Sequence, residues 1–348
     1  MNLSELAVPI VQAPMAGGPS TVELAAAVGR AGGLGFLAAG YKTASAMIEE
    51  VQRLRASVDT PFGVNLFVPQ ALPDRASVAP YQAELAGEAI RYGVELPELD
   101  FGGGWTTDHW DDKIAFLVDH PVPVVSFTFD LPSDLVTDDL HRGGSYLVGT
   151  VTSVAEARAA VARGMDALCV QGPEAGGHRG IHDPFAEPGR TPLLNLLAEI
   201  GAETTIPLIA AGGLMTGTDI ATALRGGALA VQLGTAYLRT PESGAAPAYK
   251  AALIDPRFSE TVVTRAFSGR PARGLRNRFI AAHDATAPAG YPLVNQLTRP
   301  LRAAAAKLDD PDGLALWTGT GHHRIVDNPA EALTERLWQD ARTILGRG

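Results

Sequence analysis

A histidine flanked by glycines is the residue in this sequence best suited to acid–base chemistry. His178 follows Gly176 and Gly177 in a loop that comes directly after an apolar run ending at Gln171. Histidine is the side chain that most readily exchanges a proton near neutral pH, and glycines let a bound molecule approach the backbone closely. A lone loop histidine is more often a surface residue, but these glycines and the position after a strand favour a catalytic role. The Gln171 amide could hydrogen-bond the edge of a ring.

Two glycine-containing turns indicate a phosphate site. Each follows an apolar run, and they come in the order expected for the last two strands of an α/β barrel. Barrels commonly bind phosphate at these two turns through backbone N–H groups. One Gly-Gly pair would be weak evidence, whereas two turns in the expected order are considerably stronger. The residues concerned are Gly212, Gly213, Gln232, Leu233, Gly234 and Thr235.

Three other positions at strand ends or within strands call for a functional or a structural interpretation. The first apolar run ends in Ala13-Pro14-Met15, which fits a tight turn or a close ligand about equally well. Asn65 ends another run and could bind the pyrimidine edge of a flavin, although such an asparagine is more often a turn former or a cap. Cys169 lies inside an apolar run, so we expect it to pack and not to act as a nucleophile.

Eight apolar runs, most of them separated by helical stretches, must position these residues. Continuous apolar runs are typical of strands that are buried on both faces. Eight strand–helix units predict an α/β fold, a closed (β/α)8 TIM barrel with its functional residues after the strands; a doubly wound open sheet is the alternative. The expected strands are Val8–Ala13, Leu34–Leu37, Phe62–Leu66, Val122–Phe129, Ser145–Val151, Ala167–Val170, Pro207–Ala211 and Ala230–Leu233.

Capping residues support the helices between these strands. Ser153 precedes Glu156 by three residues, the spacing of a capping box. Glycines that favour a left-handed C-cap follow four of the helices, at Gly143, Gly164, Gly201 and Gly226. The expected helices are Thr21–Ala31, Thr43–Ala56, Asp134–Arg142, Ser153–Arg163, Pro192–Gly201 and Gly217–Arg225.

Two stretches interrupt the regular spacing. Residues 67–119 are too many for one crossover helix and predict an insertion after the third strand, with a helix around Pro80–Tyr92 and a Gly/Trp segment at Phe101–Trp110. Residues 236–348 predict an appendage of helices and loops. We therefore expect residues 1–235 to form the barrel, insertion included, and both additions to cover its mouth.

Composition narrows the function classes. A formal net charge of −10 argues against a nucleic-acid partner and against an anionic membrane surface. No signal peptide or apolar run long enough to span a bilayer is expected, and one cysteine cannot form an internal disulfide. We expect a cytoplasmic protein that is a monomer or a homodimer.

Metal chemistry and two common catalytic motifs find no support. His322-His323 lacks the spaced partners that a metal site needs, so we expect no metal. Neither a Gly-x-Ser-x-Gly elbow nor a Walker loop is present. An arginine-rich run could hold phosphate or pair with acidic groups, and we favour the structural role; its members are Arg265, Arg270, Arg273, Arg276 and Arg278.

Over nearly its whole length the sequence resembles the nitronate monooxygenases, also called 2-nitropropane dioxygenases. Seven segments together carry the resemblance, and as a set they are highly specific. They are Pro9–Ser20, Gly63–Phe67, Ser126–Phe129, Gln171–Gly180, Ala210–Gly213, Gln232–Thr235 and Thr264–Gly274.

This resemblance implies an FMN-bearing barrel that oxidises alkyl nitronates with O2 to nitrite and a carbonyl compound. His178 would be the catalytic histidine, which removes the α-proton of a neutral nitroalkane; a nitronate needs no such base. The flavin would take one electron from the nitronate. By resemblance the FMN contacts are Asn65, Gln171, Gly176, Gly213 and Gln232 through Thr235.

The resemblance also covers two segments of the appendage. One segment is similar to a family segment that lines the mouth, and it comprises Tyr291-Pro292 with Asn295, Thr298 and Arg299. Residues 317–321 are similar to another family segment. At position 320 the family pattern leads us to expect an amide, where this sequence has threonine. The substrate pocket is therefore expected to depart from the family pattern more than the cofactor site.

Two other functions fit the same barrel. An FMN-dependent NAD(P)H:quinone reductase or enoyl-thioester reductase would share the flavin motifs, although the histidine after Gly-Gly favours the monooxygenase. A non-catalytic flavin-binding or sensor protein is disfavoured because no DNA-binding or signalling domain is attached. Rapid bleaching of the flavin by NADH or NADPH without oxygen would identify the reductase.

Overall fold

The computed structural model describes residues 3–99 and 106–346, and its centre is a barrel of eight parallel strands. The ring closes where Val11 of the first strand bridges Leu34, directly before the second. This closure confirms the TIM barrel and excludes an open sheet. In spatial order the strands are β1 (Ile10–Gln12), β9 (Ala230–Leu233), β8 (Leu208–Ala211), β6 (Ala167–Gln171), β5 (Tyr146–Val151), β4 (Val124–Thr128), β3 (Phe62–Phe67) and β2 (Gly35–Ala38).

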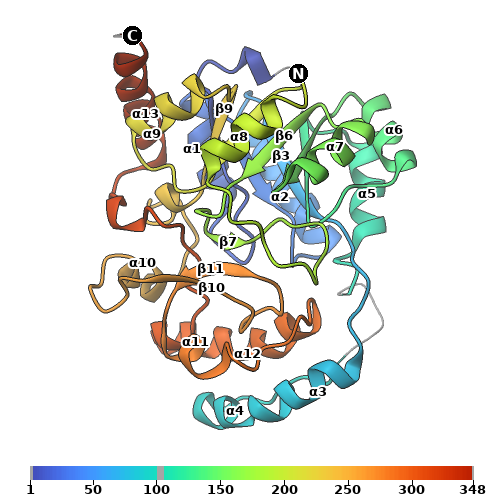
Figure 1. Cartoon of the computed structure of the whole chain (residues 1–348), viewed down its shortest axis with the longest axis vertical. Helices are drawn as coiled ribbons and strands as arrows, with labels where there is room; N and C mark the ends of the chain where they lie inside the picture. The colour runs from blue at the N-terminus through green and yellow to red at the C-terminus, as the bar shows by residue number, and fades with distance from the viewer. Residues whose placement is uncertain (1–2, 100–105, 347–348) are drawn as a thin grey trace.

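Helices surround the barrel, and the six that we predicted lie within a residue or two of their expected bounds (Figure 1). Five begin at a serine or threonine whose hydroxyl accepts a hydrogen bond from an N–H in the first turn, which satisfies a donor that the helix leaves unpaired. These helices are α1 (Val22–Arg30), α2 (Ala44–Ser57), α6 (Asp134–Arg142), α7 (Val154–Ala162), α8 (Leu193–Gly201) and α9 (Gly217–Arg225).

The capping details differ in part from the prediction. Ser153 caps α7, but the Glu156 carboxylate accepts from the backbone N–H of Thr152 at 2.6 Å and not from Ser153. A full capping box occurs instead on α9, where the side chains of Thr216 and Asp219 each accept from the other's backbone N–H. The three-residue spacing therefore marked a true cap at Ser153 but the wrong partner for Glu156.

Left-handed glycines also follow the helices, but not always at the predicted position. Gly164 has φ +83° as expected. After α6 and α9 the left-handed residues are Gly144 and Gly227, at +85° and +99°. The left-handed residue follows the C-cap, so the second glycine of each pair takes it. Gly201 is the last residue of α8 and has no positive φ.

Two helices outside the predicted repeat complete the wall of the barrel. Helix α5 (Trp110–Asp119) ends the predicted insertion and packs beside α2 and α6. Helix α13 (Ala330–Leu345) ends the predicted appendage and packs against α9 and α1, where it buries Leu333 and Leu337. The appendage therefore does not lie wholly over the mouth, because its last helix covers the side of the barrel.

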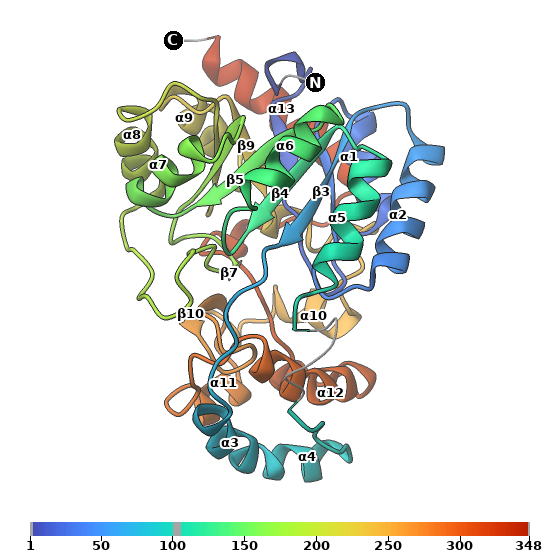
Figure 2. The same cartoon turned by 90° about the vertical axis from the view of Figure 1, so that its right-hand side faces the viewer.

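The remaining additions form a lobe at the carboxyl ends of the strands (Figure 2). The helix expected around Pro80–Tyr92 is two helices, and the segment Phe101–Trp110 lies largely outside the described residues. The lobe has its own apolar core, which includes Tyr81, Phe267 and Phe279. Its elements are α3 (Arg75–Glu84), α4 (Ala86–Tyr92), α10 (Pro247–Ala252), β10 (Thr261–Thr264), β11 (Ala272–Leu275), α11 (Arg278–His283) and α12 (Leu293–Lys307).

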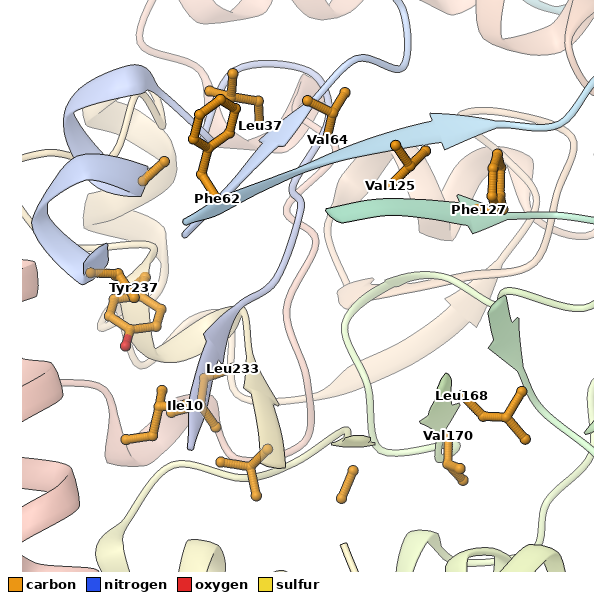
Figure 3. Packing of buried hydrophobic residues seen from close by; sticks show 14 of the residues in the cluster. Ile10, Leu37, Phe62, Val64, Val125, Phe127, Leu168, Val170, Leu233 and Tyr237 are labelled. Atoms are coloured by element: carbon orange, nitrogen blue, oxygen red, sulfur yellow. The ribbon is translucent and has the colours of Figure 1, made fainter. Parts of the chain in front are cut away.

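Alternation along the strands decides which residues reach the mouth of the barrel. Leu168 and Val170 of β6 point outward into the core between strands and helices (Figure 3). The intervening Cys169 packs in the inner core, and Gln171 lines a cavity at the mouth. Side chains in a strand alternate between its two faces, so Val64 of β3 likewise faces outward while the next residue faces inward.

Candidate active site

A cavity of about 350 Å³ lies at the carboxyl ends of the strands, between the barrel and the lobe. All but one of the predicted site residues line it. The exception is Leu233, whose side chain packs in the core outside the barrel (Figure 3). The lining residues among those predicted are Ala13, Pro14, Met15, Asn65, Gln171, Gly176, Gly177, His178, Gly212, Gly213, Gln232, Gly234 and Thr235.

Three backbone N–H groups that lack an acceptor in the described part of the chain belong to residues that line the cavity, after strands β8 and β9. Among the described residues, no acceptor is paired with the N–H of Gly213, Gly234 or Thr235. Gly213 has φ +71°, and a Cβ there would lie 2.9 Å from the Cβ of Glu174, so the turn requires glycine. Several free donors at closely spaced turns suit an acceptor-rich group such as a phosphate.

Asn65 offers the cavity an amide oxygen that is not engaged by the described residues. Its Nδ2 donates to the hydroxyls of Ser126 at 2.9 Å and Thr128 at 3.1 Å. Its Oδ1 has no partner within the described part of the chain, and the residue lines the cavity. An amide oxygen at the cavity wall can accept a hydrogen bond from a ligand, so this atom fits the N–H edge of a bound ring.

Gln171 lines the cavity as expected, and its side-chain amide is hydrogen-bonded at both ends. Its Nε2 donates to the backbone oxygen of His178 at 2.9 Å, and its Oε1 accepts from the N–H of Gly180 at 2.8 Å. Both ends of the amide thus hold the loop that carries His178. Gln171 still lines the cavity, but its hydrogen bonds shape the loop.

His178 sits on a short strand that the sequence did not reveal. This strand, β7 (Gly177–His178), pairs with β11 of the lobe, opposite Ala272. The imidazole Nε2 lies 2.8 Å from the Ser268 hydroxyl, which can in turn donate to the carbonyl of Arg270 at 3.2 Å. In that arrangement Nε2–H donates to Ser268, and Nδ1 is left as the basic nitrogen.

The imidazole of His178 is held uncharged. Burial lowers its pKa, and the nearby guanidiniums of Arg270 and Arg302 lower it further, to about 3. Aromatic rings enclose it, with centroids at 5.6 Å for Phe129 and 5.7 Å for Trp317. An uncharged imidazole keeps one ring nitrogen with a free lone pair, so it can accept a proton from a bound carbon acid.

A second cavity of about 680 Å³ adjoins the first. Tyr41, Phe67, Asn295 and Arg302 line both. Arg302 donates through Nη2 to the Oδ1 of Asn295 at 2.7 Å, so a guanidinium stands where the two spaces meet. This position gives the junction a positive charge.

Several lining residues were not predicted individually. Tyr41, Phe129, Ser268 and Arg302 line the first cavity. Phe129 and Ser268 belong to two of the segments that carry the family resemblance, which was the signal available for them. Nothing in the local sequence pointed to Tyr41.

The appendage residues named from the resemblance have unequal roles. Asn295 lines both cavities and Arg299 lines the second. Thr298 is buried and donates to the Phe267 carbonyl. Thr320 is exposed and donates its N–H to the carbonyl of Glu174. The amide expected at position 320 would therefore lie beside the glycine turn of Gly213, outside the cavity lining.

Cys169 is buried within β6. Burial raises the pKa of the Cys169 thiol to about 12, so it stays protonated at neutral pH. No group of three His, Cys, Asp or Glu side chains that could hold a metal occurs in residues 3–99 and 106–346. Over the same residues no helix has the length and apolar character to cross a bilayer.

The arginine-rich run divides into two kinds. Arg265, Arg276 and Arg278 form ion pairs with glutamates, as the structural interpretation expects. Arg270 and Arg273 donate to an amide, a hydroxyl or carbonyls, and the described residues offer neither of them an ion pair. The two kinds therefore cannot share one explanation.

Comparison with known proteins agrees with the motifs. The family model described as nitronate monooxygenase matches residues 2–340. A probable nitronate monooxygenase of Staphylococcus saprophyticus is 38% identical, over 97% of this chain and 96% of that protein, and one of Bacillus subtilis is 34% identical over 98% of each.

Solved structures give the same result. A nitroalkane oxidase from Streptomyces ansochromogenes is 50% identical and superposes with a TM-score of 0.93 over 99% of both chains. FabK from Thermotoga maritima is 26% identical with a TM-score of 0.76, over 99% of this chain and 96% of that one. The chain belongs to the nitronate monooxygenase family, whose members are oxidoreductases.

Proposed function

We propose that this enzyme oxidises alkyl nitronates with O2, giving nitrite and a carbonyl compound, and that it uses non-covalent FMN to do so. One observation carries the proposal: a single cavity is lined both by unpaired backbone N–H groups and by an uncharged histidine. The N–H groups suit a phosphate, and the histidine suits the role of proton acceptor. Family membership supplies the reaction class.

The chain's own residues fit a mononucleotide. The N–H groups of Gly213, Gly234 and Thr235 would hold the phosphate, and the free Oδ1 of Asn65 would accept from the ring. No Gly-x-Gly-x-x-Gly dinucleotide fingerprint follows a strand. When bound, the flavin supplies the electron acceptor, while the protein supplies position and electrostatics.

His178 has a role only for neutral nitroalkanes. Its basic nitrogen would take the α-proton, and this step creates a nitronate anion beside the new imidazolium. That opposite charge raises the pKa of the imidazole from its low value in the free protein. The guanidinium of Arg302 at the cavity edge also favours the anion. Substrates added as nitronates bypass this step.

Nitrite release and oxygen uptake test the proposal directly. The purified protein should consume O2 and release nitrite from propionate 3-nitronate and from a simple alkyl nitronate. The flavin released by heat should chromatograph as FMN. No nitrite from any nitronate, with rapid anaerobic bleaching of the flavin by NADH or NADPH, would show a reductase instead.

A further inference from the structure

Phe129 has a backbone conformation that a large side chain rarely adopts. It lies directly after β4 with φ +84°, in the left-handed region. Its ring is fully buried and lines the first cavity. Such a residue persists only where its surroundings fix it firmly, and such positions cluster at functional sites. The contacts of Phe129 therefore show what holds it.

Arg270 covers the Phe129 ring. The guanidinium carbon lies 4.0 Å from the ring centroid, which is cation–π distance. The Arg270 side chain is fully buried; its Nη1 donates to the Oε1 of Gln70 at 2.5 Å, and its Nη2 donates to the carbonyl of Ile181. A buried guanidinium without a carboxylate is costly to stability, so its position beside the cavity calls for a functional reason.

Gln70 holds the backbone of the same phenylalanine. Its Nε2 donates to the Phe129 carbonyl at 2.8 Å and to the His182 carbonyl at 3.1 Å. Because its Oε1 also accepts from Arg270, one amide connects the backbone of Phe129 to the cation that covers its ring. The strained residue is thus fixed at both its carbonyl and its ring.

We propose that Arg270 is a positioning residue that acts with Gln70 to hold the Phe129 ring against His178. The two rings meet edge to face, with centroids 5.6 Å apart and planes at 85°. Arg270 does not line the cavity, whereas Phe129 and His178 do. The inference rests on the proposed function, because the residue that Arg270 helps to position, His178, is the one that would accept the proton.

The guanidinium of Arg270 also has an electrostatic effect on the imidazole of His178. The charged or titratable groups that face His178 are Arg270, Arg302 and Tyr291. Burial keeps Tyr291 protonated because it raises the pKa of its hydroxyl. Among the described residues, the two guanidiniums therefore bring charge to His178 at neutral pH, and each of them opposes protonation of the imidazole.

Arg270→Lys separates position from charge. Lysine keeps the cation but cannot stack a planar group on Phe129 while it bonds Gln70 and Ile181. The measurement is an NMR spectrum of protein with labelled histidine, in which the ring-proton resonances of His178 are assigned because they are missing from His178→Asn. A Phe129→Leu variant shows where these resonances lie without the ring current of Phe129. In Arg270→Lys the His178 resonances should shift toward those positions. Turnover of neutral nitroalkanes should fall about tenfold, and nitronate oxidation much less.

Two further variants complete the experiment. Gln70→Ala removes the other half of the support and should move the His178 resonances in the same direction, so it decides the matter if Arg270→Lys does not fold. Arg276→Lys is the matched control, because Arg276 is exposed in an ion pair with Glu260. It should change neither the resonances nor the turnover.

The His178 resonances decide the inference. If they stay at the parent positions in both folded variants, Arg270 and Gln70 do not position Phe129, and the inference is overturned. Nitrite formation by the parent is a separate result. A parent that forms no nitrite, with variants that still shift the resonances, would overturn the proposed function and leave the positioning role standing.

Discussion

The Nε2 of His178 lies 2.8 Å from the hydroxyl of Ser268, a residue 90 positions later in the chain. The segment after barrel strand β6 carries the histidine on β7, and the lobe brings the serine through the loop before β11. The candidate base is therefore oriented by a part of the chain outside the barrel repeat. Both parts must pack together before the site exists.

Ser268→Ala should lower nitroalkane turnover by about tenfold, because the imidazole loses the partner that sets its tautomer and orientation. Nitronate oxidation should change little, since it needs no base. Steady-state nitrite assays on both substrate forms check this. Ser243→Ala is the control, since Ser243 is also buried but does not line the cavity.

His178→Asn should reduce turnover of neutral nitroalkanes by about 10²-fold or more, the usual scale for a positioned acid–base group. Oxidation of nitronates should fall much less, and the flavin content should stay the same. The ratio of the two rates is the measurement. Equal losses on both forms would instead give His178 a role in binding the anion.

The pKa of His178 also predicts how stability depends on pH. Its value of about 3 in the folded protein lies below the ordinary value of about 6.5. Between these values the unfolded chain binds a proton here and the folded protein does not, so the contribution to stability rises with pH. From pH 5 to 7 the free energy of unfolding should rise by about 1–2 kcal/mol more in the parent than in His178→Asn. Urea denaturation of both proteins at pH 5 and pH 7 measures these free energies. An equal change in the free energy of unfolding between the two pH values in both proteins would contradict the prediction.

Gly213→Val should abolish flavin retention and leave most of the helical circular dichroism. The added side chain meets Glu174, and φ +71° strains any non-glycine residue. The flavin absorbance of the purified protein, relative to its protein concentration, measures retention. Gly87→Val is the control, because a Cβ at Gly87 meets nothing within 4 Å. Normal flavin content in Gly213→Val would remove this turn from the site.

Leu337→Ala should lower the free energy of unfolding by about 2–4 kcal/mol, because it opens a void where α13 packs on the barrel. Leu337 is 4% exposed in that core. Leu308→Ala, at a residue that is 65% exposed, should change stability by less than about 0.5 kcal/mol. A small effect at Leu337 would mean that α13 contributes little to the barrel.

Local pattern was enough to predict the barrel and a group of residues that line its cavity. Buried parallel strands read as continuous apolar runs, and the strand period of two places the amides Asn65, Gln171 and Gln232, in or at the end of β3, β6 and β9, at the mouth. The glycine turns could be located because glycine is needed wherever backbone must approach a ligand or take a positive φ. These features depend on neighbours in the chain, so the sequence shows them.

The tertiary structure alone decided which of these residues are free to bind and which are already engaged. Gln171 and Asn65 look alike as strand-end amides, but the loop of His178 engages both ends of the first and leaves one atom of the second open. The partners Ser268 and Arg270 come from a lobe whose packing against the mouth has no periodic signal. The sequence analysis placed α13 in the appendage and not in the barrel for the same reason. A long segment lies between α13 and the last barrel strand, so the sequence does not show that α13 packs against α9 and α1 in the ring of helices. Contacts between distant segments depend on how apolar faces fit in space, and this fit is what the linear pattern does not contain.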